Sequence, residues 1–285
     1  MKRNFKMKIR YDGTRFQGWE SQPGVEMTIE GKIETVLRRM LEDEMGEGDL
    51  TSEKTSLKTL GKISGEDAAD NNDNTALINA GMPVKVIASG RTDAGVHAIG
   101  QVANVHLDTD MTVADIQSYL NRYLPDDIAI EDLKDASERF HARYNALGKT
   151  YRYTCYYGDS KPVFDRKYVN VLDQEPNVRA MRQAAEYLIG THDFKSFCAN
   201  PRMRKSTVRC VDSIEIEKEG PYIRMYFHGN GFLQNMVRIL SGTLLEVGFG
   251  RMTPERVGEV LEAKDRKLAG PTAKAQGLCL MEVDY

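Results

Sequence analysis

The sequence predicts an α+β protein made of two similar α/β halves, each built on an antiparallel sheet. Short stretches of alternating apolar and polar residues recur along the chain, and several neighbouring stretches are separated only by a turn. Helical stretches with apolar residues three or four positions apart lie between them, as is typical of α+β proteins. The order strand, helix, strands, helix, strand broadly repeats after residue 138, without a residue-level repeat. We therefore expect an N-terminal half over 1–138 and a C-terminal half over 139–285.

The N-terminal half begins with a strand over 5–11, where apolar residues occupy every second position. Thr28 can act as the N-cap of a helix whose apolar residues recur at helical spacing as far as Leu41. Residues 46–82 lose this pattern and are rich in Gly, Asp, Asn, Ser and Thr, so we expect an acidic, mobile insertion. The next predicted elements are strands over 84–89 and 100–107, a helix over 112–124 capped by Thr112 and Asp115, and a strand over 128–136.

The C-terminal half repeats this alternation. One helix begins with a Thr253 cap followed by Pro254 at its first position, and another is predicted to end at Gly190 in the left-handed conformation. A Gly-Pro turn joins two alternating strands into a hairpin. In chain order, we expect a strand over 149–157, a helix over 177–190, a hairpin over 208–229, helices over 232–248 and 253–263, and a strand over 277–285.

The charge of the chain is distributed unevenly. The formal net charge is −3, but residues 42–73 hold ten acidic residues and three lysines, which leaves a net +4 on the rest. Two stretches, 139–152 and 200–209, carry four cations each and no acid, and the first also carries three aromatic rings. Cations mixed with flat rings suit phosphates and unstacked bases, although a solvated surface above buried aromatic residues has the same composition.

Cysteine and histidine usage argues against a metal site. The four cysteines form no Cys-x-x-Cys pair, and the five histidines are scattered, so we expect reduced thiols and no metal site. The first ten residues alternate like a strand and lack the apolar core of a signal peptide. No apolar run is long enough to cross a bilayer. We therefore expect a soluble, cytoplasmic protein without a membrane partner.

The stretch "ASGRTDAGVHA" (88–98) contains the most distinctive candidate site. Gly90 and Gly95 flank Arg91 and Asp93 in a turn between two predicted strands. Arg91 can curl back to pair with Asp93 and keep it ionised, which makes Asp93 a candidate nucleophile or base. A purely structural turn, in which the aspartate caps backbone N–H groups, fits the same spacing.

"GRTDAGVHA" resembles the signature loop of the tRNA pseudouridine synthase A family. "YDGTRFQGW", "FHARYNALGKTYRY", "NGFLQNMVRILSGTLLEVGFG" and "AKDRKLAGPTAKAQGLCL" also resemble family segments in the family's order, and the likeness covers the chain except about 46–82. It implies the pseudouridine synthase fold, with two halves meeting at a central cleft. It also implies a cofactor-free isomerase that converts uridine to pseudouridine at positions 38, 39 and 40 of the tRNA anticodon stem-loop, acting as a homodimer. The alternatives are an enzyme for other tRNA or RNA uridines, a non-catalytic tRNA-binding module and an unrelated hydrolase.

The same resemblance implies a role for individual residues. Asp93 matches the catalytic aspartate, which either attacks the ribose C1′ or removes the C2′ proton. Arg91 matches the arginine that pairs with it and helps displace the target base, and Tyr151 matches the tyrosine that stacks on the uracil. The implied tRNA contacts are two runs, namely Phe140, His141, Ala142, Arg143 and Tyr144, and Pro201, Arg202, Met203, Arg204 and Lys205.

Overall fold

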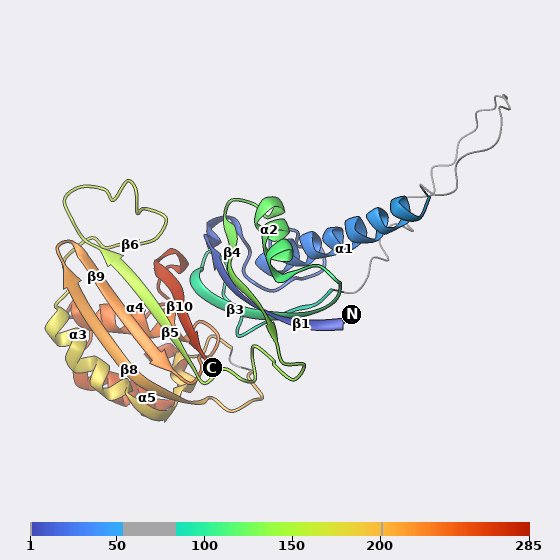
Figure 1. Ribbon diagram of the computed structural model, residues 1–285. Helices are drawn as coiled ribbons and strands as arrows, with labels where there is room; N and C mark the ends of the chain where they lie inside the picture. The colour runs from blue at the N-terminus through green and yellow to red at the C-terminus, as the bar shows by residue number, and fades with distance from the viewer. Residues whose placement is uncertain (1, 54–83, 201) are drawn as a thin grey trace, which may run out of the picture.

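The computed structural model describes residues 2–53, 84–200 and 202–285 (Figure 1). Their strands form one ten-stranded sheet in the order β4-β1-β3-β10-β5-β9-β8-β7, with β2 paired to β3 and β6 paired to β5. Most neighbours are antiparallel, and the exceptions are the parallel pairs β3–β10 and β5–β6. The predicted α+β class is therefore confirmed.

The strands that precede residue 138 gather on one side of the sheet. β1 lies between β3 and β4, α2 packs on β4, and α1 contacts both α2 and β2. The apolar residues predicted on one face of the first helix are buried, for example Ile33 and Leu37. The elements are β1 (Lys2–Tyr11), α1 (Ile29–Glu53), β2 (Val86–Ala88), β3 (His97–Asp108), α2 (Val113–Tyr123) and β4 (Ile128–Ala136).

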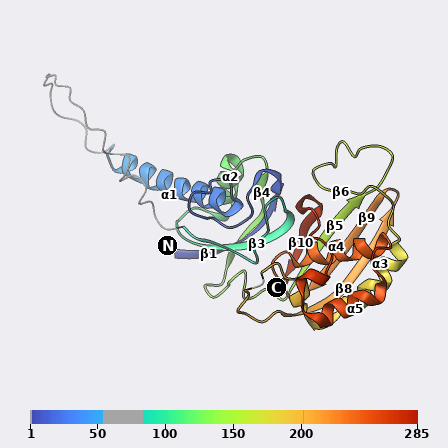
Figure 2. The same ribbon diagram turned by 180° about the vertical axis from the view of Figure 1, so that it is seen from behind.

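The later strands form the other side, where α3, α4 and α5 cover one face of β5, β8 and β9 (Figure 2). The strands are β5 (Gly148–Tyr156), β6 (Asn170–Val171), β7 (Gly190–Asp193), β8 (Val208–Glu219), β9 (Tyr222–Gly229) and β10 (Leu278–Asp284). The helices are α3 (Val178–Ala185), α4 (Met236–Gly248) and α5 (Pro254–Ala263). Short 3-10 helices are η1 (Gly13–Arg15), η2 (Glu186–Leu188), η3 (Phe194–Phe197), η4 (Arg266–Leu268) and η5 (Ala275–Gly277).

The two groups of strands meet at β10. This strand pairs with β5 along most of its length and with the first residues of β3, where Cys279 faces His97 and Leu280 faces Ala98. β2 pairs with residues 103–105 of β3, on the edge of β3 that faces away from β1. The loop that joins β2 to β3 therefore lies beside this junction. Gly100 makes the close approach possible, because a Cβ there would lie 2.1 Å from the carbonyl oxygen of Met281. The boundary between halves at residue 138 remains a prediction.

Several predicted helix starts are correct. Thr28 and Thr112 accept hydrogen bonds from the backbone N–H groups of Gly31 and Asp115, at 3.2 Å in both cases. Thr253 caps α5 in the same way, and Pro254 is the first residue of that helix. These caps satisfy N–H groups that have no partner within the helix, which is why the local sequence sufficed to locate them.

Two predicted helix boundaries are wrong. The helix predicted over 177–190 ends as an α-helix at Ala185, and Gly190, with φ of +113°, begins β7 instead of closing the helix. The helix predicted from residue 232 begins only at Met236. Asn235 has a left-handed backbone, with φ of +58°, and therefore holds 232–235 in a loop before α4.

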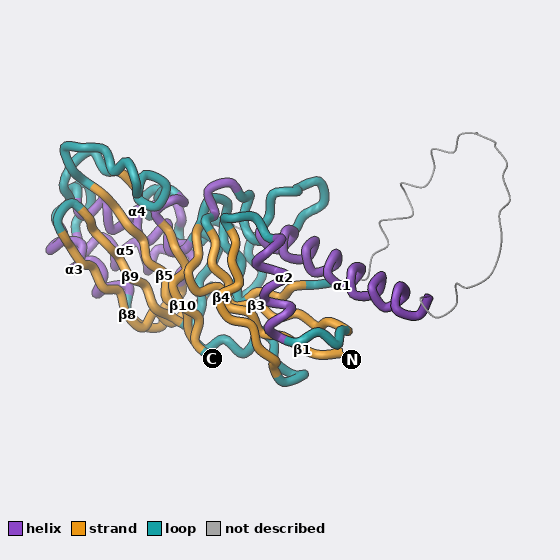
Figure 3. Tube along the Cα trace, turned by 45° about the horizontal axis from the view of Figure 1, so that its top comes forward, coloured by secondary structure: helices purple, strands orange, loops and turns teal. Residues whose placement is uncertain are grey.

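The predicted insertion over 46–82 is partly helical. α1 continues to Glu53 and projects beyond the strands (Figure 3), so the first residues assigned to a mobile segment belong to this helix. Residues 54–83, which hold most of the predicted insertion, lie outside the described part of the chain. Among the described helices, none combines the length and the apolar character needed to cross a bilayer.

Candidate active site

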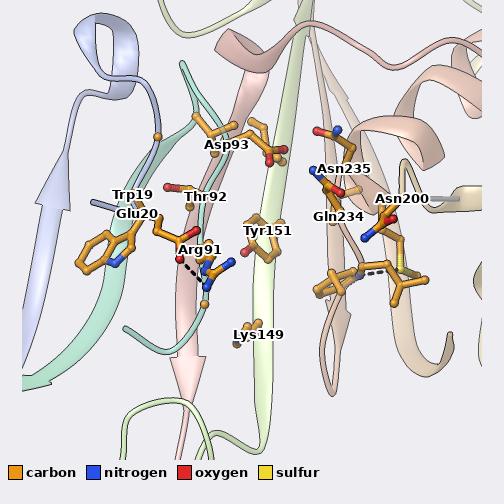
Figure 4. Close-up of a pocket in the computed structure, with 18 of the residues that line it drawn as sticks. Trp19, Glu20, Arg91, Thr92, Asp93, Lys149, Tyr151, Asn200, Gln234 and Asn235 are labelled. Atoms are coloured by element: carbon orange, nitrogen blue, oxygen red, sulfur yellow. Dashed lines mark hydrogen bonds and ion pairs between the residues drawn. The ribbon is translucent and has the colours of Figure 1, made fainter. Parts of the chain in front are cut away.

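A cavity of about 680 Å³ opens where the two groups of strands meet. Residues before α1, the loop between β2 and β3, β5, the segment before β8 and the loop before α4 all contribute to its wall (Figure 4). Because these segments come from both parts of the sheet, the junction itself forms the cavity. The side chains that line it include those of Glu20, Arg91, Asp93, Lys149, Tyr151 and Phe232.

The loop over 89–96 is held by its backbone as well as its side chains. The Trp19 N–H donates to the Thr92 carbonyl at 3.0 Å, and the Thr92 hydroxyl lies 2.8 Å from the Tyr11 hydroxyl. The buried Gln101 side chain donates to the Gly90 carbonyl at 2.9 Å. Gly95 has φ of +76°, a conformation that favours glycine. Asp93 is thus carried by a loop with little freedom to move.

The Asp93 carboxylate faces the cavity and is 34% exposed. Its Oδ2 lies 3.5 Å from Nη1 of Arg238, a residue in the first turn of α4. Burial raises the pKa of Asp93 above its usual value, and the nearby guanidinium opposes this effect without cancelling it. A carboxylate that is partly desolvated in this way is a stronger base than one in water.

Arg238 is fixed by three acceptors. Besides Asp93, it donates to the Asn235 side-chain oxygen at 2.9 Å and to the Ala273 carbonyl at 2.8 Å. Arg238 is not among the site residues predicted from the sequence, although it is the only charged residue between Asn235 and Leu245 in an apolar helix. A lone cation in such a helix is the signal that could have revealed it, because a charge there requires a partner.

The predicted pairing of Arg91 with Asp93 is wrong. Arg91 pairs instead with Glu20, with 2.5 Å between Nη2 and Oε1, and its side chain is 64% exposed. The reason is the intervening Thr92, which is buried and held on both its carbonyl and its hydroxyl, so that Arg91 leaves the loop toward Glu20 (Figure 4). Arg91 and Asp93 nevertheless line the same cavity.

Tyr151 extends from β5 into the same cavity and is 8% exposed. Its ring packs edge-on against Phe232, with 5.3 Å between the ring centroids. Burial and the Asp93 charge both raise the pKa of the Tyr151 phenol, so the hydroxyl stays neutral and remains a hydrogen-bond donor at physiological pH. The site thus offers a carboxylate and an aromatic surface side by side.

Cations surround this centre. Arg143, Arg202, Arg204 and Lys205, all predicted tRNA contacts, line the cavity together with Met203. Lys149 and Arg209 line it as well. The acidic residues in the cavity wall are Glu20 and Asp93, and each of them has an arginine partner. The excess of positive charge suits a polyanionic ligand.

The predicted contact run over 140–144 is only partly available to a ligand. Ala142 is fully buried and its N–H donates to the Asn104 side chain at 2.8 Å, so its side chain is not exposed to a ligand here. Phe140 packs on Tyr285, whereas His141 and Tyr144 stack on each other away from the cavity wall. Pro201, also a predicted contact, lies outside the described residues.

No group of three or more potential metal ligands occurs within the residues that the structure describes.

A fixed, partly desolvated carboxylate beside an aromatic ring, in a cavity rimmed by cations, defines an enzyme that acts on a nucleotide within a nucleic acid. Comparison with known proteins makes this specific. The chain belongs to the tRNA pseudouridine synthase family, whose sequence profile matches residues 7–145 and 184–285.

Curated relatives match along nearly the whole chain. The tRNA pseudouridine synthase A 1 of Clostridium tetani is 41% identical over 283 residues, covering 99% of this chain and 100% of that protein. The tRNA pseudouridine synthase A of Geobacillus kaustophilus is 39% identical over 287 residues, covering 100% and 95%. The tRNA pseudouridine synthase A 2 of Bacillus cereus is 36% identical over 282 residues, covering 99% of both. The resemblance inferred from the sequence is thus confirmed.

Proposed function

We propose that the protein converts uridine to pseudouridine at positions 38, 39 and 40 in the anticodon stem-loop of tRNA. The observation that carries the proposal is the Asp93 carboxylate, fixed in a cationic cavity beside Tyr151 in a chain of this family. Relatives named tRNA pseudouridine synthase A, similar over their full length, support tRNA as the substrate.

The reaction breaks the bond between ribose C1′ and uracil N1 and forms a bond between C1′ and C5. N1 gains a proton and C5 loses one, so no electrons are gained or lost. Asp93 acts at the sugar, either by attacking C1′ or by removing the C2′ proton, and both roles require its ionised form. Its raised pKa strengthens it as a base, while the nearby Arg238 guanidinium favours its ionised form.

Tyr151 and Arg91 handle the base. The Tyr151 ring stacks on the detached uracil and prevents its loss from the cavity. Extracting the target uridine from its stack costs a few kcal/mol. The exposed Arg91 guanidinium can exchange Glu20 for the vacated space in the RNA, which offsets part of this cost.

The cations of the cavity wall bind the RNA backbone. Arg143, Arg202, Arg204 and Lys205 supply sequence-independent affinity, which weakens as salt increases. We further propose that the protein works in the cytoplasm as a homodimer in which one anticodon arm touches both subunits.

Mapping pseudouridine in tRNA from cells with and without this protein tests the substrate. The proposal predicts that pseudouridine at positions 38, 39 and 40 disappears when the protein is absent and returns when it is supplied. Loss at other positions would show an enzyme for other uridines. An unchanged modification map, together with tight tRNA binding by the purified protein, would show a non-catalytic binding module.

A further inference from the structure

Lys149 is a cation that lines the cavity and has no role in the mechanism above. It lies on β5 two residues before Tyr151, in a stretch of regular pairing with β9, so both side chains point to the same face of the sheet. Two residues of strand separate their Cα atoms by about 7 Å. Lys149 is therefore adjacent to the position at which Tyr151 would hold the uracil.

The Lys149 ammonium has a hydrogen bond but no counter-charge. Its Nζ donates to the Ser89 carbonyl at 2.7 Å, and no ion pair joins it to a carboxylate among the described residues. The charged neighbour that affects it is another cation, Arg143. Burial, followed by that repulsion, lowers the pKa of Lys149 to about 8. An ammonium group has three donors, so two remain for a ligand.

Gly90 keeps a space open for this ammonium. A Cβ atom at Gly90 would lie 2.7 Å from Lys149 Nζ, and Gly90, unlike Gly95, does not have a left-handed backbone. The glycine is thus explained by the room that the lysine needs and not by the conformation of the loop.

We propose that Lys149, supported by Arg143, is the binding site for one particular backbone phosphate of the RNA, next to the uridine that Tyr151 holds. The inference rests on the proposed function and deepens it. A phosphate supplies the negative charge that Lys149 lacks, and it accepts charge-assisted hydrogen bonds from the two free donors. The exposed Arg202, Arg204 and Lys205 can contact several phosphates, whereas Lys149 is held at one point by its hydrogen bond to the Ser89 carbonyl.

The test measures binding of an anticodon-arm RNA to wild-type protein and to Lys149→Met, Lys149→Arg and Lys134→Met. Lys134 pairs with Asp132 on β4 and does not line the cavity, so its variant controls for loss of one charge. A set of RNAs carries a neutral methylphosphonate at one backbone position each. We expect Lys149→Met to weaken binding about tenfold. We also expect the fall of log affinity with log salt to become less steep, by about 1 in the slope. Lys149→Arg should restore the slope.

The decisive result is the pattern across the RNA set. At one position next to the target uridine, the neutral phosphate should remove the difference between wild type and Lys149→Met, and at every other position the difference should persist. A defect of equal size on every RNA, or no defect, overturns the proposal. If Lys149 only supported the Ser89 carbonyl, Lys149→Met would lower the melting temperature, and its binding would not depend on which phosphate of the RNA is neutral.

A second variant reaches the same site without removing the lysine. Gly90→Ala displaces the Lys149 ammonium. We therefore expect that a neutral phosphate at that same backbone position no longer weakens RNA binding by this variant. Turnover of the wild-type protein on the unmodified RNA separates two kinds of failure. If wild type forms pseudouridine but the phosphate pattern is absent, only the Lys149 assignment fails. If wild type neither binds nor converts the RNA, the proposed function fails with it.

Discussion

Asp93 and Arg238 show how the site sets the charge of its central residue. Burial alone would favour the neutral carboxylic acid, which can neither attack C1′ nor remove a proton. Arg238 opposes this from α4, and its other two hydrogen bonds hold it in position. The balance leaves a carboxylate that is more basic than one in water, with Arg238 opposing the effect of burial.

Replacing Arg238 with Met should therefore raise the pKa of Asp93 further, because the opposing charge is lost while the burial remains. Less of the carboxylate is then ionised, so activity is lost as pH falls, and the acid limb of the pH–rate profile moves to higher pH. Single-turnover rates measured across pH check this. Arg238→Lys should move the limb back toward the wild-type position, whereas Arg256→Met, on the exposed face of α5, should leave it in place. An unmoved acid limb in Arg238→Met would show that Arg238 does not control Asp93.

Lys149 should cost stability, as expected of a residue kept for binding. Its folded pKa of about 8 lies below the usual lysine value of 10.5. Charging Lys149 therefore destabilises the fold below pH 8, and this penalty disappears as pH rises toward 10.5. We expect Lys149→Met to raise the free energy of unfolding by about 1–2 kcal/mol at pH 7, after the loss of the hydrogen bond to the Ser89 carbonyl has been subtracted. Urea denaturation at several pH values measures this. A gain that does not shrink at high pH would contradict the account.

The sequence contains enough information to select Asp93, Tyr151 and Arg91 as members of one cavity, but not their partners. The distinctive loop motif carries Arg91 and Asp93, and the resemblance of the segment around 140–153 to the family adds Tyr151. The Arg91–Glu20 and Asp93–Arg238 pairs, in contrast, depend on which segments the fold brings beside the loop. Glu20 is 71 residues from its partner Arg91, and Arg238 is 145 residues from its partner Asp93. Pairings over such distances are set by tertiary packing, which local patterns do not report.

Among the elements, the junction of β3 and β10 supports the cavity most directly. The two strands pair over only two residues, yet their backbones come close enough at Gly100 to exclude a side chain. The loop that carries Asp93 ends at β3, and β5, which carries Tyr151, lies on the other side of β10. The distance between the carboxylate and the ring is therefore fixed by this junction.

A side chain at Gly100 should separate the two strands. The Cβ of Gly100→Ala would meet the Met281 carbonyl at 2.1 Å, so we expect a loss of about 3 kcal/mol or more in the free energy of unfolding. The same substitution at Gly46 in α1, where a Cβ meets nothing within 4 Å, should stabilise the protein by about 0.5–1 kcal/mol. Urea denaturation compares the two variants. Equal stability of both would show that the close approach at Gly100 does not matter.

The predicted elements agree best with the structure where their signals are local. The Thr112 and Thr253 caps and the Gly-Pro hairpin turn are correct because neighbouring residues make the contacts. The start of α4 was missed because the apolar pattern continues back to Phe232, while the left-handed Asn235 interrupts the helix. The parallel pairing of β10 with β3 could not be predicted either, because it joins residues that lie far apart in the sequence.

At the scale of the whole molecule, a net negative chain still forms a cationic cavity. The acidic residues are concentrated between 42 and 73, whereas the arginines and lysines of the later segments converge at the junction of the sheet. Average charge therefore says little about the ligand, and the position of each charge in the fold says more. The continuous sheet combines the carboxylate from one group of strands with the aromatic ring and most of the cations from the other.

Asp93 is the residue proposed to perform the chemistry on a uridine of the anticodon arm. Single-turnover formation of pseudouridine in an unmodified anticodon-arm transcript, by wild type and by Asp93→Asn and without added cofactor, tests this role. The account predicts conversion by wild type and a rate at least about a thousandfold lower for Asp93→Asn. The Kd of Asp93→Asn for the RNA should be unchanged or lower, because a negative charge leaves the cationic cavity. Near-normal conversion by Asp93→Asn would contradict the account.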